Sequence, residues 1–556
     1  MKKITLVAFL FITLGFKPIF AQNKKQVKVI TANSSKEVAR PKLVVGIVVD
    51  QMRWDYLYRY YARYGEGGFK RLLGKGFSCE NTMINYLPSY TAVGHSTIFT
   101  GSVPSIDGIS GNDWIDQLTG KNMYCTSDST VTSVGTESAD GKMSPRNLLV
   151  STITDELRLA TNFKSKVIGV SLKDRASILP AGHLGSAFWL DDASGNFITS
   201  SYYSKELPAW VTKFNNEKNV AKLLSNGWNT LYPINTYTQS TEDDVPWEGK
   251  YSGEKTTTFP HDLKAVYEKS KGVIRSSPFG NTLTLALATE AVKANAMGKG
   301  TATDFLTINC ASTDYVGHQF GPNSIEVEDT YLRLDKDLKN FFDMLDANVG
   351  AGNYTIFLTA DHGAAHAINF MKAHNLPASG WNSDQLEKDL NKMLVDKYGK
   401  GNLIREIKNY QVNFDLAKIS GENLDFEAIK RATCDYIKMQ PGITYAIDVE
   451  KIGSLPIPEP IKSMVINGYN FKRSGQIQII LNSGDFEGTS STGTTHGTWS
   501  PYDAHIPLVW YGWGIKHGTT NALVNMTDIS ATLAGLLHIQ MPNGCIGKPI
   551  VELFSK

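Results

Sequence analysis

From Lys42 onward, short apolar runs alternate with amphipathic stretches. Leu43–Val49 and Tyr354–Ala360 are nearly all apolar and rich in β-branched residues, which is typical of strands buried on both faces of a parallel sheet. The same pattern predicts strands at Asp304–Cys310 and Ile506–Trp510, and helical periodicity predicts helices at Trp54–Lys75 and Ile325–Leu345. This alternation predicts an α/β fold, with a central, mostly parallel sheet and helices on both of its faces.

Two stretches interrupt the alternation. Residues 176–279 are rich in Trp, Tyr, Ser, Thr and Asn with little periodicity, which indicates a long insertion that caps the site. Residues 371–483 have the pattern of a helix, a strand, a helix and two more strands, so we expect a small α+β subdomain there. Its expected elements are Gln385–Lys397, Tyr410–Phe414, Phe426–Lys438, Ile443–Val449 and Gly475–Leu481.

The first residues predict export. Lys2 and Lys3 precede an apolar stretch over residues 4–16, and the form of the whole segment is that of a signal peptide, residues 1–21, cut after Ala21. Residues 22–41 are polar and basic and predict a flexible arm, which leaves 42–556 as the folded domain. The apolar stretch is short for a bilayer, and no later one reaches the roughly 18 apolar residues of a transmembrane helix. We therefore expect a periplasmic or secreted protein without a transmembrane anchor.

Composition allows a large globular enzyme and disfavours other classes. The chain has 556 residues, of which 42% are hydrophobic, enough for a substantial core. Loss of Lys2, Lys3 and Lys17 with the signal peptide leaves 53 basic against 54 acidic side chains. Nucleic-acid binding, which usually leaves a basic stripe, is therefore not expected, and we expect a monomer. Five cysteines without a CxxC spacing disfavour a disulfide scaffold and a thiolate zinc site, although one or two bridges remain compatible with the sequence.

Carboxylates and imidazoles follow several of the predicted strands. Asp50 ends the first run, Asp361-His362 ends the run at 354–360, and Asp314 and His318 follow the run at 304–310. Because ligands collect beyond the carboxyl ends of strands in open α/β sheets, these side chains predict one metal site. Singly, such an Asp is often a helix N-cap and such a His is often structural. Together, three Asp and three His form two sets of three ligands with open positions, as catalytic zinc requires. The full set is Asp50, Thr91, Asp314, His318, Asp361, His362 and His496.

These segments resemble the alkaline phosphatase superfamily, in particular its phosphodiesterase/nucleotide pyrophosphatase branch. The motifs are the strand ending in Asp50, Thr91-Ala-Val-Gly-His95, Asp314…His318, Asp361-His362-Gly363 and Gly493-Thr-Thr-His496-Gly497, and they extend over nearly all of residues 42–556. Two further segments are similar to bacterial phosphate-irrepressible alkaline phosphatases, which are monoesterases with a threonine nucleophile. These segments are Gly111-Asn112-Asp113-Trp114 and Ser171-Leu-Lys173-Asp-Arg175.

The resemblance implies two zinc ions per chain. One would be bound by Asp314, His318 and His496. The other would be bound by Asp50, Asp361 and His362, and the oxygen of Thr91 would be a further direct ligand of this zinc. Thr91 would then be the nucleophile, because coordination to a dication lowers the pKa of a hydroxyl. Two alternatives remain open: Thr91 is only the N-cap of a helix over 92–99, or the nucleophile is Ser89 or Ser96.

Asn112, Lys173 and Arg175 would bind the phosphoryl group. An Arg can hold two phosphoryl oxygens at once and a Lys supplies a compact charge, whereas surface salt bridges are the default for such residues without the resemblance. Lys173 and Arg175 are two residues apart, so both can reach one ligand only if the backbone turns after Ser171. This cationic pair favours phosphate-monoester dianions over diesters.

The expected function is that of an exported two-zinc alkaline phosphatase, which hydrolyses phosphate monoesters through a phosphothreonine intermediate. The alternative is a phosphodiesterase or nucleotide pyrophosphatase with the same metal site. A sulfatase is disfavoured because Pro88-Ser-Tyr-Thr-Ala lacks the Cys/Ser-x-Pro-x-Arg pattern, and a binding protein is disfavoured because all six protein ligands are present. Mixed Asp/His ligation also suits manganese, iron or cobalt.

Overall fold

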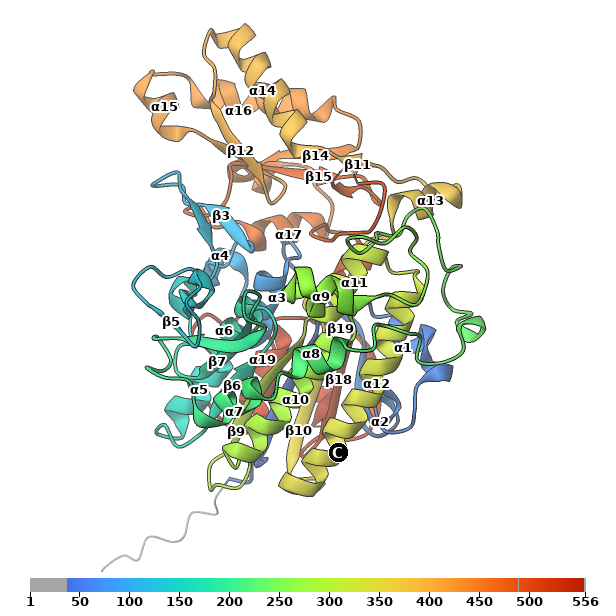
Figure 1. Ribbon diagram of the computed structural model, residues 1–556. Helices are drawn as coiled ribbons and strands as arrows, with labels where there is room; N and C mark the ends of the chain where they lie inside the picture. The colour runs from blue at the N-terminus through green and yellow to red at the C-terminus, as the bar shows by residue number, and fades with distance from the viewer. Residues whose placement is uncertain (1–37, 489, 555–556) are drawn as a thin grey trace, which may run out of the picture. The chain divides into compact units, whose positions relative to one another are not determined.

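A sheet of eleven strands forms the centre of the computed structural model, which describes residues 38–488 and 490–554. Ten strands lie in the order β17-β2-β18-β10-β1-β9-β6-β7-β8-β5, and β19 pairs with β2 (Figure 1). Their bounds are β17 (His505–Ile506), β2 (Phe77–Met83), β18 (Leu508–Gly512), β10 (Tyr354–Thr359), β1 (Leu43–Val49), β9 (Asp304–Cys310), β6 (Val167–Val170), β7 (Ser186–Asp191), β8 (Asn196–Ser200), β5 (Ser133–Val134) and β19 (Gly518–Asn525).

The middle of this sheet is parallel. Strands β10, β1, β9, β6 and β7 run in one direction, and Leu43 at the start of β1 lies opposite both Asp304 and Tyr354. Every residue of β1, β9 and β10 is buried, which explains why their sequences are mostly apolar rather than alternating. The outer strands β18, β2 and β8 add antiparallel pairs. The predicted fold class, an α/β fold with a central, mostly parallel sheet, is confirmed.

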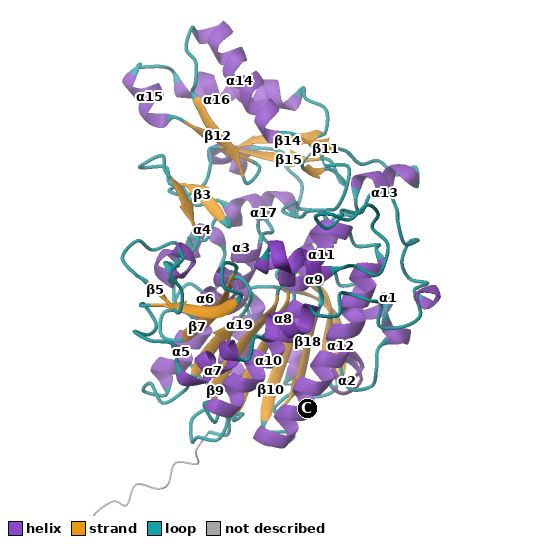
Figure 2. Ribbon diagram, in the orientation of Figure 1, coloured by secondary structure: helices purple, strands orange, loops and turns teal. Residues whose placement is uncertain are grey.

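Helices cover both faces of the sheet (Figure 2). Helix α10 (Phe279–Ala294) and helix α6 (Asp174–Ala181) both contact β6 and β9. Helix α12 (Ile325–Leu345) packs on α10, whereas α3 (Thr91–Thr100) packs on α6 and on α19 (Asp528–Leu537). The remaining helices here are α4 (Pro104–Asp107), α5 (Ile153–Ala160), α11 (Ser312–Phe320) and α18 (Pro501–Ala504).

Two predicted elements are interrupted. The helix expected at Trp54–Lys75 consists of α1 (Tyr56–Arg59), a 3₁₀ turn (Tyr61–Arg63) and α2 (Phe69–Lys75), because the three glycines between residues 65 and 68 break the helical run. The strand expected at Ile506–Trp510 divides at Pro507 into β17 and β18, since proline has no N–H for the sheet.

The predicted insertion, residues 176–279, begins later than expected. Its first part contains α6, β7 and β8, and β7 pairs with β6 in the central sheet. The remainder forms α7 (Ala209–Asn216), α8 (Asn219–Leu224), α9 (Leu263–Lys269) and connecting loops. This part is tied to the site region, because the carbonyl of Trp247 accepts a hydrogen bond from Gly493 (2.8 Å) and the N–H of Gly249 donates to Gln319 (2.8 Å).

Residues 371–483 contain a separate sheet of four strands. Its order is β12 (Ile404–Lys408), β13 (Gln411–Phe414), β15 (Ile477–Leu481) and β14 (Ile443–Asp448). The helices are α13 (Ile368–Ala373), α14 (Ser383–Tyr398), α15 (Leu416–Gly421), α16 (Phe426–Lys438) and α17 (Ile461–Gly468). The sheet and helices α14, α15 and α16 share an apolar cluster of their own, whereas α17 packs into the main core. Two small sheets, β3 (Asp113–Ile115) with β4 (Asn122–Tyr124) and β11 (Gly380–Trp381) with β16 (Phe486–Glu487), complete the strands.

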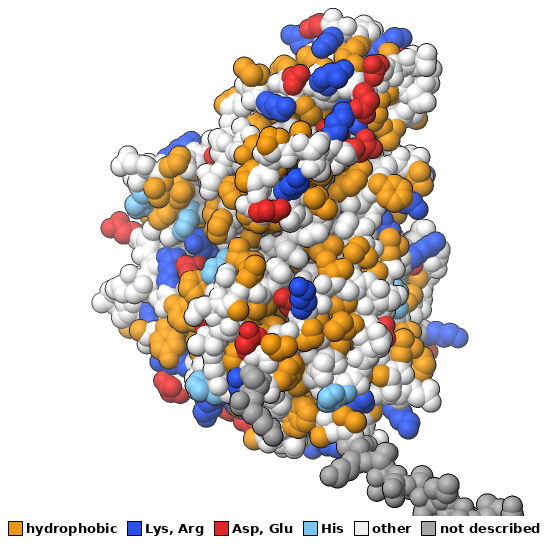
Figure 3. Space-filling view, turned by 180° about the vertical axis from the view of Figure 1, so that it is seen from behind, with side chains coloured by type: hydrophobic (Ala, Val, Ile, Leu, Met, Phe, Trp, Pro, Cys, Tyr) orange, Lys and Arg blue, Asp and Glu red, His pale blue; other side chains and the backbone are white. Residues whose placement is uncertain are grey.

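The surface seen in Figure 3 carries acidic and basic side chains interspersed with one another. Over the described residues, none of the helices is both long enough and apolar enough to cross a membrane. All five cysteines are free thiols. The predicted signal peptide, residues 1–21, lies outside the described residues. So do residues 22–37 of the predicted arm, which was expected to end at residue 41.

Candidate active site

Three buried carboxylates meet at one edge of the central sheet. Asp50 directly follows β1, Asp314 lies in the first turn of α11 after β9, and Asp361 lies two residues after the last residue of β10. Because these three strands are parallel neighbours, their carboxyl ends deliver the side chains to the same place. None of the three residues is more than 4% exposed. The structure thus brings together the carboxylates that the sequence predicted to converge.

Three histidines join these carboxylates, and the Nδ1 atom of each is held by a backbone carbonyl. The Nδ1 distances are 3.0 Å from His362 to Gly363 O, 2.7 Å from His318 to Thr494 O and 2.7 Å from His496 to Ser89 O. This arrangement leaves Nε2 of each ring to face the carboxylates. Nε2 of His318 lies 3.1 Å from Asp314 Oδ1, and Nε2 of His362 lies 3.4 Å from Asp361 Oδ2. Such orientation by the second ring nitrogen is typical of metal-ligating histidines.

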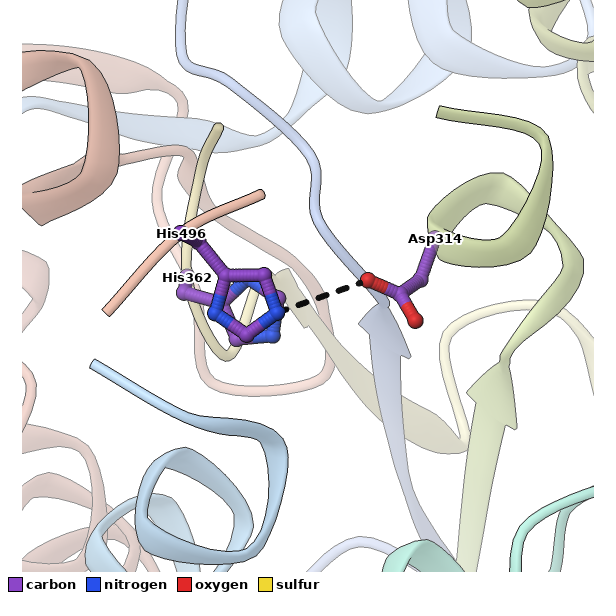
Figure 4. Close-up of side chains that lie close together, drawn as sticks. All are labelled: Asp314, His362 and His496. Atoms are coloured by element: carbon purple, nitrogen blue, oxygen red, sulfur yellow. Dashed lines mark ion pairs between the residues drawn. The ribbon is translucent and has the colours of Figure 1, made fainter. Parts of the chain in front are cut away.

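Five of the six side chains form two overlapping groups. Asp50, Asp361 and His362 offer ligand atoms within 4.8 Å of one another, as do Asp314, His362 and His496. The rings of His362 and His496 stack with centroids 3.5 Å apart, and Nε2 of His496 lies 3.8 Å from Asp314 Oδ1 (Figure 4). The first group matches the predicted set. In the second, His362 takes a place beside Asp314 and His496, while the predicted His318 lies next to Asp314 on the same helix.

The donor set fits divalent cations. Two buried carboxylate oxygens, Oδ1 of Asp50 and Oδ2 of Asp361, have no hydrogen-bond partner. Burial, and then the charge of Asp50, raises the pKa of Asp361 well above its ordinary range, and burial lowers the pKa of His362 to about 4. Buried acids with unpaired oxygens and neutral imidazoles are the arrangement that a cation stabilises, and carboxylate with imidazole is a ligand set that zinc accepts.

Thr91 opens helix α3 and faces the two metal-ligand groups. Its hydroxyl oxygen lies 3.4 Å from His362 Nε2 and 3.5 Å from Lys173 Nζ. Tyr90, not Thr91, is the N-cap of this helix, and the side chain that accepts an N–H of the first turn is that of Asn112, so the interpretation of Thr91 as only an N-cap is wrong. The close approach depends on Gly94, because a Cβ there would overlap the backbone of Asp361.

Lys173 lies between the two groups. After β6 the backbone turns, and Lys173 becomes the N-cap residue of α6. Its ammonium donates to Asp314 Oδ2 (2.6 Å) and to Asp50 Oδ2 (2.9 Å). Burial acts to lower the pKa of Lys173, but the charges of Asp314 and Asp50 outweigh it and hold the pKa above the ordinary value. The side chain is therefore a buried cation that forms ion pairs with two of the three carboxylates.

Arg175 and Lys173 line the same cavity, which has a volume of about 380 Å³. Nη1 of Arg175 donates to the hydroxyl of Tyr124 (3.1 Å), and that hydroxyl donates to Asp174 (2.8 Å). Asn112 lies at the start of α3, where its Oδ1 accepts the N–H of Ala92 (3.0 Å). Because its oxygen is engaged, its amide nitrogen is the atom that can donate to a ligand.

Sequence reasoning missed two neutral residues of this region. Gln51 bonds to Asp361 through its backbone N–H (3.1 Å) and to Asp314 through its side chain (2.7 Å), and Tyr124 orients Arg175. Neither residue carries a charge or a spacing signal. The position of Gln51 directly after Asp50 was the one available hint.

Comparison with known proteins places this site in a family. The model of the type I phosphodiesterase / nucleotide pyrophosphatase family matches residues 44–500. The chain is 57% identical to "Alkaline phosphatase PafA" of Elizabethkingia meningoseptica over 94% of this chain and 96% of the relative. It is 52% identical to a Myroides odoratus protein named "Calcium-transporting ATPase" (94% and 96%), and 51% identical to "Alkaline phosphatase PhoV" of Synechococcus elongatus (96% and 96%).

A solved structure agrees with these relatives. The crystal structure of wild-type alkaline phosphatase PafA superposes with a TM-score of 0.91 at 58% identity, covering 93% of this chain and 100% of that chain. The agreement extends over the central sheet and the strand ends that carry the site. The chain belongs to the type I phosphodiesterase / nucleotide pyrophosphatase family of the alkaline phosphatase superfamily.

Proposed function

We propose that this protein is an exported alkaline phosphatase that hydrolyses phosphate monoesters through a phosphothreonine intermediate, with two zinc ions per chain. One observation carries the proposal: a threonine hydroxyl at a helix N-terminus lies beside a buried cluster of three carboxylates and two histidines, with the partly exposed His318 at its edge. The names of the similar alkaline phosphatases support the same reaction.

The residues fit two cation sites. Asp50, Asp361 and His362, with the Thr91 oxygen, would hold one cation, and Asp314, His318 and His496 would hold the other. When bound, the cations supply the positive charge that acidifies the Thr91 hydroxyl and stabilises the oxygen of the departing alcohol. The position of His362 next to both groups allows it to contribute to either one.

The chain's own residues carry the covalent chemistry. Oγ1 of Thr91 forms a bond to phosphorus while the bond from phosphorus to the ester oxygen breaks, and the alcohol leaves after taking up a proton. Water then attacks phosphorus, the bond from phosphorus to Oγ1 breaks, and Thr91 regains its proton as inorganic phosphate leaves. Thr91 lies in the first turn of α3, and a helix N-terminus favours a phosphoryl anion; one N–H of this turn, that of Ala92, is bonded to Asn112.

Asn112, Lys173 and Arg175 would bind the phosphoryl oxygens. The amide of Asn112 is turned by its bond to Ala92, and the guanidinium of Arg175 is held by Tyr124, so both donors are oriented before substrate arrives. Lys173 adds a buried positive charge between Asp50 and Asp314. Two cationic side chains and one amide, three donors in all, suit the three terminal oxygens of a monoester dianion.

A phosphodiesterase is the second candidate, because the family model that matches the chain is that of phosphodiesterases and nucleotide pyrophosphatases. Lys173 and Arg175 line the neighbouring cavity and favour the monoesterase, because they offer two cationic donors to a dianion. The cavity as a whole is lined by three cationic and three acidic side chains. The deciding experiment compares kcat/KM for a monoester, a diester and a sulfate ester with one common leaving group. A diester preference would overturn the proposal. Export would be tested by locating the protein and determining the N-terminal residue of its mature form, with Gln22 expected.

A further inference from the structure

Gln51 joins the two candidate metal-ligand groups. Its backbone N–H donates to Asp361 Oδ1 at 3.1 Å, and its side-chain amide donates to Asp314 Oδ1 at 2.7 Å. Asp361 belongs to one group and Asp314 to the other. Both bonds are buried, and Gln51 itself is 3% exposed.

The backbone of Gln51 has an unusual conformation. Its φ is +61°, in the left-handed region that residues other than glycine seldom adopt. This turn follows Asp50 directly and sends the N–H toward β10 and the side chain toward α11. Backbone strain at a buried non-glycine residue persists where the surrounding structure holds it, which often occurs at functional sites.

Helix α11 is shaped to receive this side chain. A Cβ at Gly317 would overlap Oε1 of Gln51, and the three nearest heavy atoms to that Cβ all belong to Gln51. Alanine would otherwise suit a helix interior better than glycine. Gly317 is thus explained by the need to admit Gln51 between Asp314 and His318.

Glutamine is suited to this place. Asp314 receives the ammonium of Lys173 on Oδ2 and the amide of Gln51 on Oδ1, so its carboxylate is fixed at both oxygens. The amide donates without adding charge to a site that already holds three carboxylates. A glutamate at this position would lose the amide donor and add a fourth carboxylate to the site.

We propose that Gln51 is a positioning residue that sets the carboxylate of Asp314 for the cation bound by the Asp314 group, with Gly317 as its matched partner. The inference rests on the proposed two-cation site. It predicts an asymmetry, because a side-chain substitution removes the bond to Asp314 but retains the backbone bond to Asp361. Only one of the two cations should then bind more weakly.

The test is zinc binding by the full chain at graded free zinc, set by a chelator, with bound zinc per chain read by elemental analysis. For Gln51→Leu, we expect the dissociation constant of one zinc to rise about ten- to a hundredfold, the usual effect of removing such a partner. The other should be unchanged. The control is Gln385→Leu, on the exposed side of α14, which should match the native protein. Equal weakening of both zinc ions, or of neither, would overturn the proposal.

Gly317→Ala provides a second arm with its own thermal unfolding control. In the native background it should displace Gln51 and weaken the same zinc. In the Gln51→Ala background it should do no further harm, because the clash is gone. An equal loss in both backgrounds would contradict the pairing of Gly317 with Gln51. A native chain that binds no zinc would instead overturn the proposed function, and this inference with it.

Discussion

The hydroxyl of Thr91 lies 3.4 Å from Nε2 of His362. His362 Nδ1 is bonded to the carbonyl of Gly363, so the nitrogen that faces Thr91 is the one left for a ligand. A threonine that begins a helix without capping it, and that faces a ligating nitrogen, has its hydroxyl in a position to react rather than to stabilise the helix.

Thr91→Ala should abolish turnover of monoesters and the trapping of a phosphoenzyme, while zinc content remains near that of the native protein. Thr91→Ser should retain appreciable activity, because the hydroxyl performs the chemistry. Rapid acid quenching with labelled substrate measures the phosphoenzyme. Ser89→Ala and Ser96→Ala are the matched controls. Loss of the phosphoenzyme in one of these, with Thr91→Ala active, would assign the nucleophile elsewhere.

Lys173→Ala combined with Arg175→Ala should lower kcat/KM for monoesters far more than for diesters. Each charge-assisted hydrogen bond contributes about 1.5–3 kcal/mol, which corresponds to about ten- to a hundredfold in rate. A diester has one charge and one terminal oxygen fewer than a monoester, so its kcat/KM depends less on the two cationic side chains. The exposed Lys213→Ala is the control. An equal proportional loss of both activities would favour the phosphodiesterase reading.

Chelation should abolish activity, and about two zinc ions per chain should restore it. The reason is the pair of buried carboxylate oxygens, on Asp50 and Asp361, that have no hydrogen-bond partner among the described residues. Activity is titrated against added zinc after removal of metal, with bound zinc measured in parallel. Full activity in the metal-free protein would contradict the two-cation site.

His261 should make stability depend on pH. Its ring nitrogens lie 3.1 Å from Glu254 and 3.2 Å from Glu326, and although burial acts to lower its pKa, these acids raise it from 6.5 to about 9. Since the folded pKa lies above the unfolded one, this stabilisation is complete below pH 6.5 and is lost as the pH rises to about 9.

His261→Gln should remove this dependence, which amounts to on the order of 3 kcal/mol. Urea unfolding of the two proteins at pH 6 and pH 9 provides the measurement. The difference in unfolding free energy between native protein and variant should be large at pH 6 and small at pH 9. A difference that is the same at both values would contradict the prediction.

The buried strands could be predicted from sequence because both of their faces are covered. The bounds of β1 and β9 match the predicted runs, since burial on both sides leaves few polar positions within them. Strand β12 was not predicted, because Arg405 and Lys408 on its exposed side interrupt the apolar pattern. Burial of one face leaves a weaker signal than burial of both.

The charged part of the candidate site could also be predicted, whereas its neutral part could not. Asp50, Asp314 and Asp361 stand next to strand ends, and the chain order alone brings parallel strand ends together. Gln51 and Tyr124 act through single hydrogen bonds to residues distant in sequence, and neither hydropathy nor motif spacing records such a bond. The signal peptide at residues 1–21 and the flexible arm at residues 22–41 remain predictions.

The separate four-stranded sheet lies in the chain between His362 and His496. Asp50, Asp361 and His362 are therefore all present once synthesis has passed residue 362, whereas the other group waits for residue 496 near the end of the chain. A nascent or truncated chain that stops within the separate sheet holds at most one complete cation site. If the two cation sites are as proposed, binding of the second cation would require a chain that extends past residue 496.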